Sequence, residues 1–142
     1  DTLLIPAIGL EETLASVYRK AQASGKLNRG QLRLVVLLGE QSRANARILS
    51  EQLSDDSFAP PGGGDVRGLG PGAAAKEYLT TALGFENQVY LNYLDAIGSL
   101  SPGAASLAVT GIAASTAQHL ALLREALGRT PIPAPAETGA NA

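Results

Sequence analysis

Residues 59–72, APPGGGDVRGLGPG, are the stretch that decides how the rest of the chain is arranged. They hold six glycines and three prolines, which is too many for a regular helix or strand, so we expect a long irregular connection here. Apolar residues recur at helical spacing on both sides of it. The segment therefore divides the chain into two helical halves.

The half before this connection predicts two helices joined by a tight link. The first spans about residues 5 or 7 to 23 and ends before Gly25, because glycine suits the left-handed conformation that ends a helix. The second spans about residues 28–53. Their apolar stripes are Ala7, Leu10, Leu14, Val17, Tyr18 and Ala21 in the first, and Leu32, Val35, Val36, Gly39, Ala46 and Leu49 in the second.

The half after the connection predicts a second pair of helices. The third helix spans about residues 73–97 and stops at Gly98, and the fourth runs from Ser101 to about Leu127. Ser101 is a suitable N-cap, and the proline after it is favoured at the first helical position. Residues 129–142 are rich in proline and alanine and predict a flexible tail after a single domain at 1–128.

Composition excludes several classes of function for this chain of 142 residues. Hydrophobic residues make up 45% and charged residues 17%, which is enough apolar material for one core. The absence of cysteine excludes disulfides and thiolate metal sites, and a single histidine limits imidazole ligation. A net charge of −2 and 4% aromatic residues argue against nucleic-acid binding.

Location and membrane contact are predicted from two further features. No apolar run is expected to reach the ~20 residues that cross a bilayer, so we predict no membrane span. Methionine is missing even at position 1, which favours a processed and exported chain, with a cytoplasmic location as the alternative.

Polar residues interrupt the apolar stripes near the middle of every predicted helix. Burial of such groups is costly unless other groups pair with them, so their positions are informative. The residues concerned are Glu11 in the first helix, Glu40 and Arg43 in the second, Glu86 in the third and His119 in the fourth. Placing Glu11 over Glu86 also places Tyr18 over Tyr93, which suggests two similar hairpins.

This pattern resembles the ferritin-like superfamily over about residues 5–128, and within it the small bacterial ferritin-like domains of unknown function. Their halves read E-x6-Y followed by E-x-x-H, and many are exported. The resemblance implies an all-α four-helix bundle with a long middle crossover and two similar helical hairpins. It also implies a di-iron or di-manganese centre held by four glutamates and two histidines.

Two departures from that pattern shape the functional prediction. The matching segments are Glu11 with Tyr18, Glu40-Gln41-Ser42-Arg43, Glu86 with Tyr93, and Thr116-Ala117-Gln118-His119. Arg43 stands where the motif has histidine, and Thr116 stands where it has glutamate. Arginine cannot ligate a metal, so we expect Arg43 to pair with Glu40 or Glu11 and to replace one metal ion electrostatically.

We therefore expect a non-catalytic scaffold or interaction protein without cofactor, in which Glu11, Glu40, Glu86 and His119 are vestigial ligands. Arg43, Thr116, Tyr18, Tyr90 and Tyr93 would complete a buried polar network. One alternative is a metal-binding protein or oxidase that keeps a single Fe, Mn or Zn ion at Glu40, Glu86 and His119. Another is a self-assembling structural protein. The partner that we expect for the chain is a second copy of itself or another protein.

Overall fold

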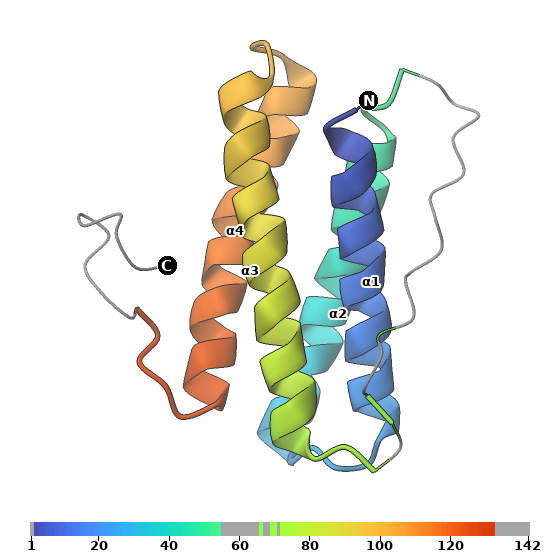
Figure 1. Ribbon diagram of the computed structural model, residues 1–142, viewed down its shortest axis with the longest axis vertical. Coiled ribbons are helices and arrows are strands. Elements are labelled where there is room, and N and C mark those ends of the chain that lie inside the picture. Colours follow the sequence, from blue (N-terminus) through green and yellow to red (C-terminus); the bar gives the residue numbers. More distant parts are fainter. Residues whose placement is uncertain (1, 55–65, 67–68, 71, 133–142) are drawn as a thin grey trace.

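A computed structural model of the chain describes residues 2–54, 66, 69–70 and 72–132 (Figure 1). Most of the glycine-rich connection predicted at 59–72 lies outside the described residues. The same holds for most of the C-terminal tail predicted at 129–142.

The described residues form four helices and no strand, which confirms the predicted all-α four-helix bundle. They are α1 (Leu4–Ala23), α2 (Arg29–Ser50), α3 (Ala75–Ser99) and α4 (Ala104–Ala126). Helix α1 packs against α2 and α3, and α4 packs against α3 and α2, so α1 and α4 lie diagonally across the bundle. Helices α2 and α3 run parallel, as a long middle connection requires (Figure 1).

Local signals set three of the helix ends, namely the start of α2 and the ends of α1 and α4. Asn28 caps α2: its side chain accepts from the Gln31 amide at 2.9 Å, and the Gln31 side chain accepts from the Asn28 amide at 3.0 Å. Gly25 after α1 has a φ value of +67°, the left-handed conformation predicted for it, and Gly128 after α4 has a φ value of +70°. Helix α4 begins at Ala104, slightly later than predicted, and Gly103 before it provides no side-chain cap.

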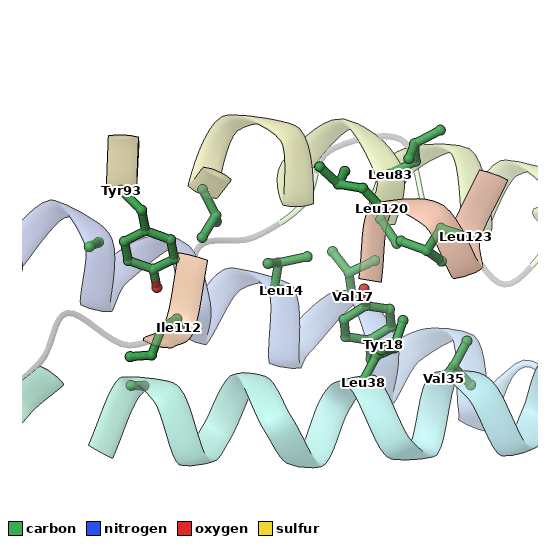
Figure 2. Packing of buried hydrophobic residues seen from close by; sticks show 14 of the residues in the cluster. Leu14, Val17, Tyr18, Val35, Leu38, Leu83, Tyr93, Ile112, Leu120 and Leu123 are labelled. Carbon is green, nitrogen blue, oxygen red and sulfur yellow. The ribbon is translucent and has the colours of Figure 1, made fainter. Parts of the chain in front are cut away.

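The core is filled by side chains from all four helices (Figure 2). Burial of a leucine or valine contributes roughly 1.5–3 kcal/mol each, so this cluster supplies most of the stabilisation. The largest fully buried apolar and aromatic side chains are Ile8, Leu14, Val17, Tyr18, Val35, Leu38, Leu49, Leu79, Tyr93 and Leu123. Tyr18 and Tyr93 lie at separate levels of this core (Figure 2).

Helix α4 corrects the expectation that no apolar run approaches a membrane span. Its 23 residues are long and apolar enough to cross a bilayer by length and composition, which is true of no other described helix. The same helix packs against α2 and α3 and buries Thr116 and His119 in the bundle. A core helix of a bundle passes the same test, so this is weak evidence for a span.

Helices α1 and α2 make their close approach at Gly39. A Cβ atom at this buried position would lie 3.0 Å from Cβ of Tyr18, which is closer than normal packing allows. The Tyr18 Cβ is fixed to the backbone and its side chain is fully buried, so it cannot move aside. Glycine at 39 therefore allows α2 to come this near to α1 at Tyr18.

We expect Gly39→Ala to lower the free energy of unfolding by about 1–3 kcal/mol, because the added methyl group overpacks this contact. Gly84→Ala in α3 is the matched control: a Cβ there meets nothing within 4 Å, and the change should stabilise by up to about 1 kcal/mol. Denaturant unfolding of both variants measures the difference. Equal stabilisation by the two changes would contradict the close approach.

Candidate functional site in the bundle core

Two carboxylates, one from α1 and one from α3, are buried in the apolar core. Glu11 and Glu86 are each only 1% exposed. The Tyr93 hydroxyl donates to Oε1 of Glu11 at 2.5 Å, and the Tyr18 hydroxyl donates to Oε1 of Glu86 at 2.6 Å. Each glutamate is seven residues from the tyrosine of its own helix, and because α1 and α3 are antiparallel, each is level with the tyrosine of the other.

Each carboxylate has a second polar partner: a residue of α2 contacts Glu11, and a residue of α4 contacts Glu86. Asn45 donates from Nδ2 to Oε1 of Glu11 at 3.1 Å, and His119 Nδ1 lies 3.2 Å from Oε1 of Glu86. His119 Nε2 contacts Oε1 of Gln41 and lies 3.2 Å from Oγ of Ser115. We call the following residues the core circuit: Glu11, Tyr18, Gln41, Asn45, Glu86, Tyr93 and His119. Its hydrogen bonds connect all four helices in a ring.

Burial dominates the electrostatics of the circuit. It raises the pKa of Glu11 to about 7; the Tyr93 hydrogen bond opposes this and the charge of Glu86 adds to it. Burial also raises the pKa of Tyr18 and of Tyr93 well above the ordinary value, so both hydroxyls stay protonated as donors. Glu11 is thus close to half-protonated near neutral pH.

The imidazole of His119 lies between side-chain oxygens of two other helices. The side chain is buried, and its two nitrogens face Oε1 of Glu86 and Oε1 of Gln41. Because the Tyr18 hydroxyl and the His119 ring both contact Oε1 of Glu86, this buried carboxyl has two polar partners, which reduces the cost of its burial.

The structure overturns the predicted inward position of Glu40 and Arg43. Both lie on the exposed face of α2, so Arg43 does not pair with Glu11 in the core or replace a metal there. The error is one of helical phase: residues 34–38, LVVLL, are all apolar, and such a run does not show which side of the helix faces inward. The inward positions of α2 are Val35, Leu38, Gly39, Ser42, Asn45, Ala46 and Leu49.

Three residues that the sequence analysis did not assign to the site therefore lie in or beside it: Gln41, Ser42 and Asn45. Their signal was present in the similarity of the two hairpins. Glu86 follows Glu11 by 75 residues, and a similar offset counted back from Thr116 and His119 arrives at Ser42 and Asn45. Ser42 and Asn45 are buried, as Thr116 and His119 are.

The remaining predicted residues differ in their surroundings. Thr116 is buried, but its hydroxyl donates to the backbone carbonyl of Ile112 at 2.9 Å instead of facing a carboxylate. Tyr90 is half-buried against the core, and its hydroxyl takes no part in the core circuit. The hydroxyl of Ser42 is buried without a hydrogen-bond partner among the described residues.

These residues do not fit a di-metal centre. The six-ligand pattern needs four carboxylates and two imidazoles, whereas its inward positions hold Glu11 and Glu86 with Ser42 and Thr116, and Asn45 with His119. The single-ion alternative used Glu40, which is exposed and does not join Glu86 and His119. Within the part of the chain that the structure describes, no group of three or more His, Cys, Asp or Glu residues is arranged to hold a metal ion.

Comparison with protein families gives a match over nearly the whole chain. A family model described as a ferritin-like domain matches residues 2–129. No curated protein and no solved structure matches the chain.

The raised pKa of Glu11 makes stability depend on pH in a defined direction. The folded chain holds this proton up to about pH 7, whereas the unfolded chain releases it near 4.5. The resulting stabilisation is full below about pH 4.5 and is lost as the pH rises through 7. The free energy of unfolding of the wild type, relative to Glu11→Gln, should fall by roughly 3 kcal/mol over this range.

Denaturant unfolding of both proteins at a series of pH values measures this difference. The variant is the control for every other titrating group, because it removes only the Glu11 carboxyl. If the free energy of unfolding of the wild type relative to Glu11→Gln stays constant or increases as the pH rises, Glu11 is not held as a buried protonated group.

Proposed function

The chain belongs to the ferritin-like domain family, and we propose that within it this is a non-catalytic member, a helical scaffold or interaction protein that has lost its di-metal centre. One observation carries the proposal. The two glutamates that a di-metal centre would use accept hydrogen bonds from Tyr18, Tyr93 and Asn45 instead. These donors lie within α1, α2 and α3 and form part of the core.

The charge balance of the core supports the same conclusion. A pair of divalent ions needs several ionised carboxylates around it, and among the acidic residues that the structure describes only Glu11 and Glu86 are buried. Glu11 is close to half-protonated near pH 7, which lowers the available negative charge further. Neutral hydroxyls at Ser42 and Thr116 take the places of the other two carboxylates, and neither supplies charge.

The core circuit also performs the structural task that a metal centre performs in such a bundle, namely to link all four helices at mid-height. Its hydrogen bonds connect α1 with α3 twice, α1 with α2, α3 with α4, and α4 with α2. Removal of one partner would leave a buried polar group unpaired, at a cost of about 1–3 kcal/mol. The circuit therefore favours a single arrangement of the four helices without any cofactor.

Metal loading tests the proposal. Protein incubated with Fe²⁺, Mn²⁺ or Zn²⁺ and then desalted should retain far less than one ion per chain, and His119→Ala should retain the same amount. Near-stoichiometric metal in the wild type that disappears in His119→Ala would contradict the proposal. This comparison needs only the wild type and one variant.

A triple variant and a double variant together test which residues of α2 face the core, on which the proposal depends. Ser42→Glu, Asn45→His and Thr116→Glu together restore the six-ligand pattern at inward positions and should create binding of about two ions per chain. The control Arg43→His with Thr116→Glu places its histidine on the exposed face and should not. Metal binding by the control alone would show that Arg43 faces the core.

A further inference from the structure

One end of the bundle carries a dense group of positive side chains. This end is formed by the turn between α1 and α2, the start of α3 and the end of α4 (Figure 1). Residues 13–39, which include the turn, contain no aspartate or glutamate. We call the following residues the basic end: Arg19, Lys20, Lys26, Arg29, Arg33, Lys76, Arg124 and Arg129. The acidic residues described beside them are Glu77 and Glu125.

Most of these side chains are available to a partner. The exposed ones are Arg19, Lys26, Arg29, Arg33, Lys76 and Arg129. None of these six forms an ion pair with another described residue. The chain as a whole has a net charge of −2, so the remainder of the molecule is acidic and the charge is strongly asymmetric.

Apolar side chains lie among the cations of this end. Leu32 is 38% exposed and stands between Arg29 and Arg33 along α2, and Leu27 beside Lys26 is half-buried. Exposed leucine beside arginine and lysine is the combination that favours the interface of a bilayer. The one aromatic residue described near the start of α3, Tyr78, is buried, so it offers no surface on which a nucleic-acid base could stack.

We propose that the basic end docks this protein on a lipid bilayer that carries anionic headgroups. The cations are spread over a blunt end formed by four helix termini, which suits a flat surface of many negative charges. Each lysine or arginine contributes modestly near such a surface, and several acting together give measurable binding. The exposed side chain of Leu32 would enter the headgroup region between its neighbouring arginines.

This proposal names a partner for the scaffold role proposed above, but its test does not depend on metal content. The contact is electrostatic in the main, so it weakens as salt shortens the screening length to about 8 Å under physiological conditions. The acidic remainder of the molecule would face away from the membrane, which fixes the orientation of the bundle with its long axis towards the bilayer.

Two double variants of α2 provide a matched test. Arg29→Glu with Arg33→Glu reverses two exposed charges at the basic end, and Arg43→Glu with Arg47→Glu reverses two exposed charges about 21 Å further along the same helix. Both variants change the net charge equally. Sedimentation with vesicles of phosphatidylcholine containing about one quarter phosphatidylglycerol measures the binding of each protein.

We expect the wild type and the Arg43/Arg47 variant to bind these vesicles at low salt within about twofold of each other, and the Arg29/Arg33 variant to bind at least about tenfold more weakly. Vesicles of phosphatidylcholine alone should bind none of the three. Three results would overturn the proposal: no wild-type binding at low salt, equal loss in both variants, or wild-type binding to duplex DNA with none to the vesicles. In each case the metal-free scaffold proposal would stand.

Discussion

The reciprocal hydrogen bonds between Tyr18 and Glu86 and between Tyr93 and Glu11 are the constraint on which the rest of the structure depends. An ionised carboxylate in an apolar core is unfavourable by far more than one hydrogen bond can offset, so each glutamate needs several compensating partners. One carboxyl group is held close to half-protonation, and the other contacts His119 of α4. The two tyrosine hydrogen bonds require α1 and α3 to keep one antiparallel register.

That register in turn determines the packing around it. Helix α2 packs close to α1 at Tyr18, and glycine at position 39 permits this because a side chain there would meet Cβ of Tyr18. Asn45 on the inward face of α2 and the half-buried Gln41 beside that face then complete the ring of contacts with α1 and α4. The polar groups of the core thus select one arrangement among the several that an apolar bundle of leucine and alanine would allow.

The four helices were predictable from the sequence because glycine and proline separate them and because their apolar residues recur at helical spacing. Burial of Glu11 and Glu86 was also predictable, since each stands between apolar residues one turn away. In α2 the predicted apolar positions Val35, Gly39, Ala46 and Leu49 are buried, but the polar positions of its inward face were not predictable, because the apolar run at 34–38 is compatible with more than one helical phase. For that reason the sequence pattern points to Glu40 and Arg43, whereas the buried polar residues are Ser42 and Asn45.

The stability of two tyrosine variants of α3 tests the central claim most directly. Tyr93→Phe removes only the hydroxyl that donates to Glu11, and Tyr90→Phe removes a hydroxyl one turn away that lies outside the core circuit. At neutral pH, Tyr93→Phe should lower the free energy of unfolding by about 1–3 kcal/mol and Tyr90→Phe by less than about 0.5 kcal/mol. Equal losses in the two variants would show that the bundle does not depend on these hydrogen bonds.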